Sequence, residues 1–248
     1  MKPSITIKGL SVSYDRKTVL SNIYLNIQPG QLYGVIGPNG AGKSTLFKSI
    51  LGLIEVNSGK IEIFDKPIED QRKRMVYIPQ RGEVDWQFPA TVMDVVLMGR
   101  YPFKGLFERL NKKDIEIGEA SLEKMGIRAL RDRQIGELSG GQQQRVFLAR
   151  ALCQQADIFL FDEPFVGVDI TTEQKIIQIL KGLADEGKSL LVVHHDLSKV
   201  KEYFDRVILL NQRLIEVGDT ESTFTEENLA KTYGGQLTML HKTAAIKK

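Results

Sequence analysis

Hydrophobic and polar positions along the chain follow two different periods, which predict strands and helices in turn. Near the N-terminus, Ile5, Ile7, Val12 and Tyr14 are spaced as on a strand, and residues 18–27 alternate in the same way before a Pro-Gly turn. Alternation of this kind favours an antiparallel layer. Further short apolar runs predict strands over residues 31–37, 58–65, 74–80, 157–164 and 189–196, and a hairpin over 206–218.

Between these strands, apolar residues recur at the spacing of an α-helix. The segments predicted to be helical are residues 38–53 after a glycine loop, 91–101, 112–126, 142–155, 171–187 and 197–205. Because strands alternate with helices, we expect an α/β fold with a mostly parallel core sheet.

The helical block from about residue 84 to residue 156 interrupts this alternation, so we expect it to form an inserted α-helical subdomain. Residues 1–30 and 58–75 are expected to contribute to an antiparallel β-subdomain, and residues 219–248 to form a C-terminal helix and tail. The whole chain, residues 1–248, is predicted to be a single domain.

Composition narrows the class of protein. Of the 248 residues, 42% are hydrophobic and 26% charged, which is typical of a soluble globular protein, and the net charge of +3 favours an ordinary solvated surface. The single cysteine, Cys153, excludes an internal disulfide and fits a reducing cytoplasm; its place on the apolar face of a predicted helix indicates a buried residue. We expect neither a membrane span nor a signal peptide, so any action on a membrane would require a partner.

The segment GPNGAGKST carries the first chemical motif. It matches the full phosphate-loop pattern G-x-x-x-x-G-K-[ST], follows a predicted strand and leads into a predicted helix. Its glycines let backbone N–H groups face an anion, Lys43 reaches the outer phosphates, and the Ser44 hydroxyl is a ligand for Mg²⁺. The residues expected to hold the nucleotide phosphates are Gly37, Pro38, Asn39, Gly40, Ala41, Gly42, Lys43, Ser44 and Thr45.

Two carboxylates, Asp162 and Glu163, follow the apolar run Ile158–Phe161, which predicts a strand buried on both faces. Ligands of open α/β sheets lie at the C-terminal ends of the strands. We expect Asp162 to orient Mg²⁺ and Glu163 to polarise the water that attacks the γ-phosphate. These two motifs indicate a phosphate-loop NTPase, a class that includes kinases, GTPases and motors.

The stretch Leu138–Gln142, with sequence LSGGQ, narrows the class further. A small polar residue, two glycines and a helix former make a helix start with bare N–H groups, and Ser139 suits its N-cap position. This stretch resembles the signature of ABC-type ATPases, and the resemblance extends in family order over nearly the whole chain.

The resemblance implies roles for several further residues. Tyr14 takes the place of the aromatic residue that stacks on adenine, and Gln80 that of the glutamine that senses Mg²⁺ and the attacking water. Val166–Asp169 matches the loop that crosses the dimer interface. Of two neighbouring histidines, the one directly before Asp196 matches the histidine that contacts the γ-phosphate; this is His195, and side-chain alternation on a strand predicts that His194 points to the opposite face.

The family pattern explains why one chain has two anion sites. In ABC ATPases two domains face head to tail, so Ser139, Gly140, Gly141 and Gln142 would lie against the ATP held by Lys43 of a second copy. The resemblance therefore implies an ATP-dependent homodimer, with ATP and Mg²⁺ as cofactors. The residues expected to serve catalysis are Glu163, His195, Gln80 and Lys43, and those expected to hold Mg²⁺ are Ser44, Gln80 and Asp162.

A narrower resemblance concerns the transported substrate. Gln80–Arg81, Val84–Pro89, Val92–Tyr101 and Asp162–Asp169 are similar to segments of ATPase subunits of bacterial importers for manganese, zinc or chelated iron, with manganese favoured. This implies a peripheral protein on the cytoplasmic face of the plasma membrane. Its partners would be integral membrane permease subunits, which Trp86 and Phe88 are expected to contact, and indirectly an extracytoplasmic metal-binding protein.

Two other classes remain as alternatives. A soluble ABC protein acting on nucleic acid or the ribosome is disfavoured because the helical insertion is short and no basic stripe with interleaved aromatics is present, so no nucleic-acid partner is expected. A nucleotide kinase or GTPase would leave the LSGGQ stretch and His195 without a purpose.

Overall fold

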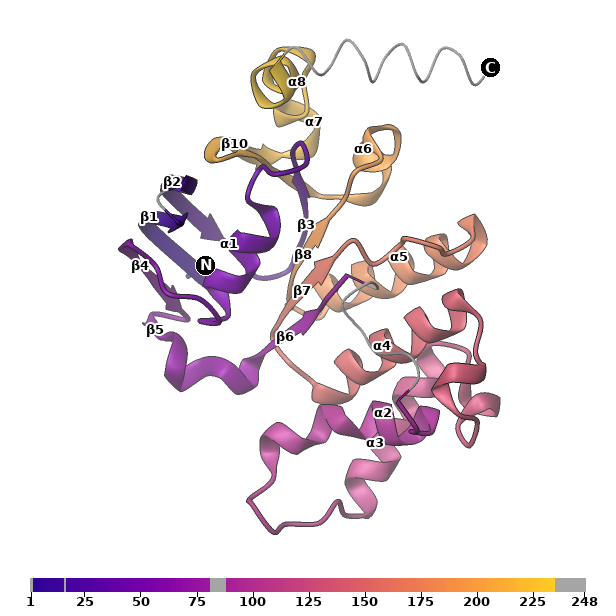
Figure 1. Cartoon of the computed structure of the whole chain (residues 1–248). Coiled ribbons are helices and arrows are strands. Elements are labelled where there is room, and N and C mark those ends of the chain that lie inside the picture. Colours follow the sequence, from indigo (N-terminus) through magenta and orange to yellow (C-terminus); the bar gives the residue numbers. More distant parts are fainter. Residues whose placement is uncertain (1, 16, 81–87, 235–248) are drawn as a thin grey trace. The chain divides into compact units, whose positions relative to one another are not determined.

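The computed structural model describes residues 2–15, 17–80 and 88–234. The chain forms two compact units: unit 1 comprises residues 1–72 and 191–248, and unit 2 comprises residues 73–190. Each unit is described by itself, and Figure 1 shows the elements of both along the chain.

Unit 1 contains an antiparallel sheet with the strand order β2-β1-β4-β5. The strands are β1 (Ile5–Tyr14), β2 (Lys17–Ile27), β4 (Ser58–Ile63) and β5 (Lys66–Pro67). Ile5 lies opposite Ile27 on one side and Ile63 on the other, and all three are fully buried. The alternation in β1 and β2 therefore does place one face in the core, as predicted.

The second sheet of unit 1 includes β10, β9, β3 and β8 in that order, with β3 parallel to β9 and β9 antiparallel to β10. These strands are β3 (Gln31–Ile36), β8 (Ser189–Val193), β9 (Arg206–Asn211) and β10 (Arg213–Asp219). The helices of this unit are α1 (Lys43–Ile50), the 3-10 helix η6 (Leu197–Lys199), α6 (Val200–Tyr203), α7 (Thr220–Thr223) and α8 (Glu226–Tyr233), and η1 (Ile68–Arg74) begins here. The predicted β9–β10 hairpin and the helix after the glycine loop are confirmed.

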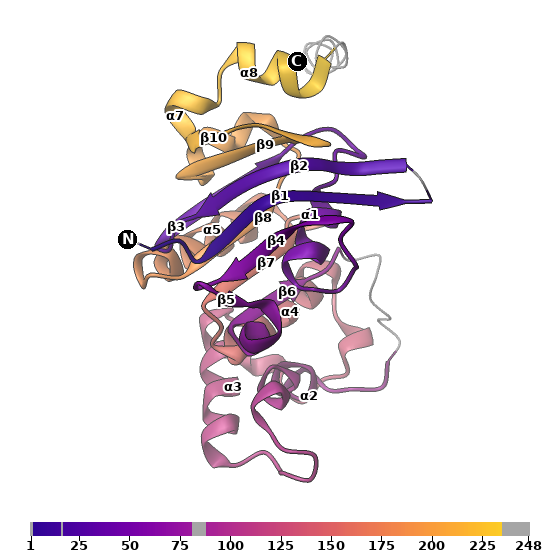
Figure 2. The ribbon, with the colours of Figure 1, turned by 90° about the vertical axis from the view of Figure 1, so that its left-hand side faces the viewer.

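Over its described residues, 73–80 and 88–190, unit 2 combines two parallel strands with four α-helices. The strands β6 (Met75–Ile78) and β7 (Ile158–Asp162) pair so that Ile78 lies opposite Phe161. The helices are α2 (Val92–Leu97), η3 (Met98–Phe103), α3 (Lys112–Lys124), η4 (Arg128–Leu130), η5 (Ile135–Glu137), α4 (Gly140–Gln154) and α5 (Ile170–Asp185). Figure 2 shows α2 and α3 together, away from the strands of the same unit.

The helix predicted over residues 91–101 changes its form partway. Thr91 and Asp94 make a capping box that starts α2, but the α-helix ends at Leu97 and continues as the 3-10 helix η3. Pro102 lies inside η3, and its ring and missing N–H do not fit an α-helix interior. Parallel pairing in both units, the antiparallel sheet and the helices confirm the predicted α/β class.

Candidate functional site

The phosphate loop lies in unit 1, between β3 and α1. Gly40 and Gly42 have φ angles of 77° and 95°, which side-chain-bearing residues rarely adopt. Gly42 is the N-cap of α1 and, having no side chain, makes no side-chain cap bond. The first N–H groups of α1 are therefore left for another acceptor, and a helix start of this kind is a binding site for an anion.

Close packing beneath the loop excludes a side chain at Gly37 and at Gly42. A Cβ atom on Gly37 would collide with the backbone oxygen of Leu210, and one on Gly42 would lie 2.9 Å from the Val19 oxygen and 2.6 Å from the Leu20 side chain. A Cβ on Gly40, in contrast, would have no neighbour within 4 Å, so the loop is open on that side. This arrangement fits a nucleotide phosphate, because the backbone lies close to the core on one side and is accessible on the other.

Lys43 folds back over the loop. Its Nζ donates to the carbonyl oxygens of Gly37 (2.8 Å) and Pro38 (2.9 Å), and the residue is buried although it is a lysine. These bonds hold the ammonium group at the loop, where it would meet the outer phosphates. Ser44, the next residue, is exposed.

Tyr14 lies at the end of β1, opposite Lys17 of β2, and is 45% exposed. Two residues earlier, Val12 lies opposite Leu20, the residue that packs against Gly42. The β1–β2 hairpin therefore brings this aromatic ring to the same end of unit 1 as the phosphate loop.

The two histidines after β8 have opposite environments. His194 is buried among the rings of Tyr203 and Phe204, with ring centroids 5.9 and 5.5 Å away, and burial lowers its pKa to about 4, helped by the neighbouring His195. His195 is exposed, and Asp196 after it accepts from the backbone N–H of Ser198 at 3.0 Å. The two histidines differ in burial, as the prediction of opposite faces requires, but both lie beyond the end of β8 at Val193 and their ring centroids are 5.9 Å apart, so strand alternation does not describe them.

Unit 2 holds the carboxylates predicted for hydrolysis. Asp162 ends β7, in which every residue is buried, and the hydroxyl of Tyr77 donates to its Oδ2 at 3.4 Å. Glu163 has a φ of 52°, so the chain turns sharply after the strand. Its Oε2 accepts a hydrogen bond of 2.9 Å from Nε2 of Gln80, so the structure joins two residues that are 83 positions apart in the sequence.

The LSGGQ stretch starts α4. Ser139 Oγ accepts from the N–H of Gln142 at 3.4 Å, and Gln142 Oε1 accepts from the N–H of Ser139 at 2.9 Å, which completes a capping box. A Cβ on Gly141 would have no neighbour within 4 Å, so this surface is open. The expected N-cap role of Ser139 is confirmed. Ser139 and Gln142 bond to each other and not to Gln80 or Glu163.

Asp169, which the family pattern places in the loop before α5, is the N-cap of that helix. Its carboxylate accepts from the N–H of Thr172 (2.9 Å) and from the Thr172 hydroxyl (2.7 Å), and these bonds lower its pKa. Within Val166–Asp169, Val166 is 39% exposed.

One residue near the phosphate loop was missed by sequence reasoning. Tyr233, the last residue of α8, is buried, and burial raises its pKa to about 12, partly offset by a hydrogen bond with the backbone of Gly37. A C-terminal helix thus supports the first glycine of the loop. An amphipathic signal existed at residues 226–233, but nothing in it indicated a contact with a segment almost two hundred residues earlier.

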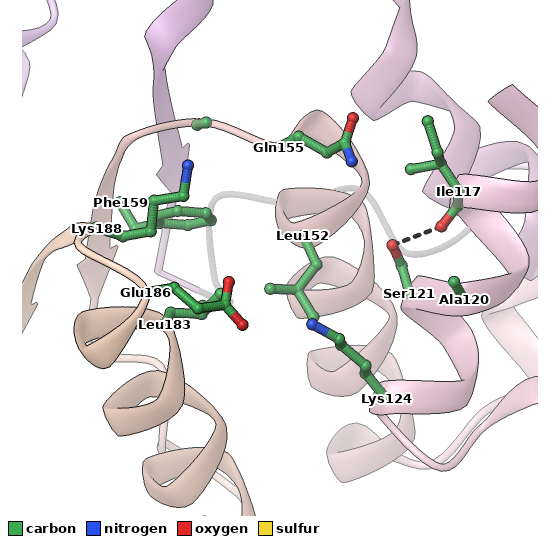
Figure 3. A pocket seen from close by; sticks show the side chains of 11 residues that line it. Ile117, Ala120, Ser121, Lys124, Leu152, Gln155, Phe159, Leu183, Glu186 and Lys188 are labelled. Atoms are coloured by element: carbon green, nitrogen blue, oxygen red, sulfur yellow. Dashed lines mark hydrogen bonds between the residues drawn. The ribbon is translucent and has the colours of Figure 1, made fainter. Parts of the chain in front are cut away.

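A pocket of about 290 Å³ in unit 2 is separate from these residues (Figure 3). Leu152 and Phe159 lie in it, Lys124, Glu186 and Lys188 surround them, and none of the predicted site residues lines it. The pocket is therefore not part of the candidate site.

The structure also bears on the cysteine, on membrane-spanning helices, on metal-binding clusters and on the residues expected to contact a permease. Cys153 is fully buried, as predicted, and burial raises the pKa of its thiol to about 11. Within residues 2–15, 17–80 and 88–234, no helix has the length and apolar character needed to span a bilayer. The same residues contain no group of three or more His, Cys, Asp or Glu side chains able to hold a metal ion. Val84 and Trp86 lie outside the described residues, and Phe88 is 53% exposed.

Comparison with known proteins agrees with the motifs. A family model described as ABC transporter matches residues 20–166, more than half of the chain. The manganese transport system ATP-binding protein MntB of Bacillus subtilis (strain 168) is 55% identical over 236 residues, covering 95% of this chain and 94% of that protein. The zinc transport system ATP-binding protein TroB of Treponema pallidum (strain Nichols) is 51% identical over 234 residues, covering 94% and 88%.

Solved structures give the same fold. An ABC transporter in an inward-facing conformation superposes with a TM-score of 0.82 at 27% identity, covering 94% of this chain and 89% of that one. A dimeric ATP-binding cassette in a post-hydrolysis state, bound to ADP and Pi, superposes with a TM-score of 0.76 at 26% identity, covering 87% and 98%. With the phosphate loop, the carboxylates at the end of β7 and the LSGGQ helix start in place, the chain belongs to the ABC transporter family and is an ATP-binding subunit of it.

Proposed function

We propose that this chain is the ATP-hydrolysing subunit of a bacterial importer for a divalent transition metal, and that the metal is manganese. The observation that carries the proposal is the 55% identity to a manganese transport ATP-binding protein over nearly the full length of both chains. Zinc is the second candidate, because a zinc transport relative is 51% identical over a similar span.

The site residues receive the following roles. The loop from Gly37 to Thr45 holds the phosphates, with Lys43 facing the outer ones, and the ring of Tyr14 stacks on adenine. Ser44, Gln80 and Asp162 hold Mg²⁺, which when bound neutralises charge on the phosphates.

Glu163 polarises the attacking water, and Gln80 keeps the Glu163 carboxylate in place through the 2.9 Å hydrogen bond. His195 contacts the γ-phosphate. Its exposed position supports this role, whereas the low pKa of about 4 and the burial of His194 make that neighbour a neutral core residue.

A second copy of the chain completes the nucleotide site. The open backbone at Gly141 lies at the start of a helix capped by Ser139, and this arrangement suits a phosphate of the ATP bound by the other copy. The dimeric homologue bound to ADP and Pi supports this assembly.

The dimer works with integral membrane permease subunits at the cytoplasmic face of the plasma membrane, and indirectly with an extracytoplasmic metal-binding protein. The exposed Phe88 is a candidate contact with the permease, and Trp86 remains a prediction from the sequence.

Metal uptake tests the proposal. A strain lacking the chain would be complemented with the wild type or with Lys43→Ala, and uptake of manganese, zinc and iron would be measured side by side. We expect only the wild type to restore manganese uptake. If the wild type restored zinc uptake alone, the proposed metal would be zinc and not manganese. If the wild type changed the uptake of none of the three metals, the importer proposal would be overturned.

A further inference from the structure

The segment between α2 and α3 presents large apolar side chains to solvent. Leu106 is 91% exposed and Phe107 is 93% exposed, and Tyr101 and Phe103 nearby are 56% and 40% exposed. Adjacent hydrophobic residues with almost no protein contact mark an interaction site more often than a core. The nucleotide site uses none of these residues. Tyr101 and Phe103 belong to η3, Leu106 and Phe107 follow it, and Figures 1 and 2 show the segment that joins α2 to α3.

The loop is held in shape by an ionic network beneath it. The Asp114 carboxylate, whose side chain is 4% exposed, accepts from Arg100 Nε (3.1 Å), Lys104 Nζ (2.6 Å) and the backbone N–H of Asn111 (2.9 Å). The Asn111 bond, then Lys104 and Arg100, lower the pKa of Asp114 to about 2, although its burial opposes this. The network therefore stays charged at physiological pH.

A second set of bonds fixes the turn that carries the apolar pair. The Glu108 carboxylate accepts from the backbone N–H of Gly105 at 3.1 Å and from Lys104 Nζ at 3.1 Å. Leu106 and Phe107 thus lie between two anchored residues. Because the turn is already ordered, little conformational entropy is lost when the pair is buried in a partner.

Charge around the pair indicates the kind of partner. Residues 100–114 contain five basic and two acidic residues, a net charge of +3, as large as that of the whole chain. Arg109, Lys112 and Lys113 are exposed, and none of the ion pairs between described residues includes them. An apolar tip flanked by uncompensated cations matches a surface that is apolar inside and anionic outside.

We propose that Leu106 and Phe107 insert into the anionic phospholipid surface of the membrane, while Arg109, Lys112 and Lys113 contact the lipid phosphates. A protein partner fits less well, because exposed basic residues flank the apolar pair and protein interfaces are depleted of charge at their centre. Lipid contact adds a direct membrane attachment to the one that the permease provides, and it depends on neither ATP hydrolysis nor the metal.

Vesicle flotation tests this contact with the purified full-length chain, without nucleotide and without membrane subunits. The probes are phosphatidylglycerol–phosphatidylcholine vesicles and pure phosphatidylcholine vesicles. We expect binding to the anionic vesicles, weakened by salt, and at least about tenfold weaker binding of the double variant Leu106→Asp/Phe107→Asp.

Two further variants separate the apolar and ionic parts. Leu53→Asp/Val56→Asp replaces another pair of exposed apolar residues, 62% and 38% exposed, and should bind as the wild type does. Lys112→Glu/Lys113→Glu should weaken binding to anionic vesicles only. Unchanged ATP binding by the tip variant would show that it is folded.

Equal vesicle binding by the wild type and the tip variant would overturn the proposal, as would equal wild-type binding to both vesicle types. If the wild type binds neither kind of vesicle and the tip variant no longer co-purifies with the permease, the surface is a contact with the membrane subunit instead. Each of these results leaves the metal-import proposal standing, because that proposal is tested by uptake.

Discussion

A single methyl group at Gly42 should disrupt the phosphate loop. Gly42 has a φ of 95°, where an added Cβ costs about 1–2 kcal/mol of backbone strain. The Cβ would also lie 2.9 Å from the Val19 carbonyl oxygen and 2.6 Å from Leu20 Cδ2. Leu20 is fully buried and the oxygen belongs to β2, so relief requires a shift of the loop, at a cost of about 1–3 kcal/mol.

Gly42→Ala should therefore lower the free energy of unfolding by about 1–5 kcal/mol, after allowing about 0.4–1 kcal/mol for the stiffer unfolded chain. Urea titration without nucleotide measures this change. The stabilisation by Mg²⁺-ATP should also shrink, because the displaced loop no longer directs its N–H groups at the phosphates.

Gly182→Ala is the matched control. Gly182 lies in α5, and a Cβ there would have no neighbour within 4 Å, so alanine should stabilise the protein by about 0.5–1 kcal/mol. If Gly42→Ala were as stable as the wild type and bound ATP equally well, the proposed strain and packing at this loop would be refuted.

Three further changes test other parts of the account. Glu163→Gln keeps an oxygen that accepts the 2.9 Å bond from Gln80, so ATP binding should persist while turnover falls by about 10²–10⁴-fold; retained turnover in an ATPase assay would remove Glu163 from catalysis. Gly141→Asp has room in the monomer and places a carboxylate at a helix start, so thermal stability should hold while ATP-driven dimerisation is lost by repulsion, and a dimer of normal mass in light scattering would contradict this. Because burial lowers the pKa of His194 from 6.5 to about 4, the unfolded chain binds its proton first as the pH falls, and this residue should contribute a loss of about 3 kcal/mol of unfolding free energy between those values. His194→Phe should remove that part of the pH dependence in acid-urea titrations, and an unchanged slope would count against it.

Local features of the fold were predictable because each carries its own signal. The glycine loop before α1, the buried strand before Asp162 and the N-cap at Ser139 follow from residues that are neighbours in sequence. The different burial of His194 and His195 was expected from side-chain alternation, although both residues lie just beyond the end of β8.

Features that depend on distant contacts were not predictable. The bond between Gln80 and Glu163 and the contact of Tyr233 with Gly37 join segments that no periodicity relates. The exposure of Leu106 and Phe107 contradicts the usual burial of such residues. The segment that carries them is anchored by the Asp114 ion pairs, whose members are polar residues with no distinguishing pattern in the sequence.

The 3-10 continuation of α2 belongs between these cases. Pro102 is a sequence signal that a regular α-helix does not continue there. The close approach of Gly99 in η3 to the backbone of Arg150 in α4 is a contact between distant segments, which the sequence does not indicate. The C-terminal segment likewise held a helix signal at residues 226–233, without indicating two short helices, α7 and α8.

The central claim is that ATP held by one copy is completed by the LSGGQ helix start of another. Disulfide-length crosslinking tests it most directly, with Ser44→Cys on one chain and Ser139→Cys on a second chain, both carrying Glu163→Gln. The native Cys153 is fully buried with a pKa of about 11, so it should stay unreactive. We expect a crosslinked dimer only when the two chains are mixed with ATP. No crosslink between chains, together with an efficient one within a single chain carrying both cysteines, would contradict the account.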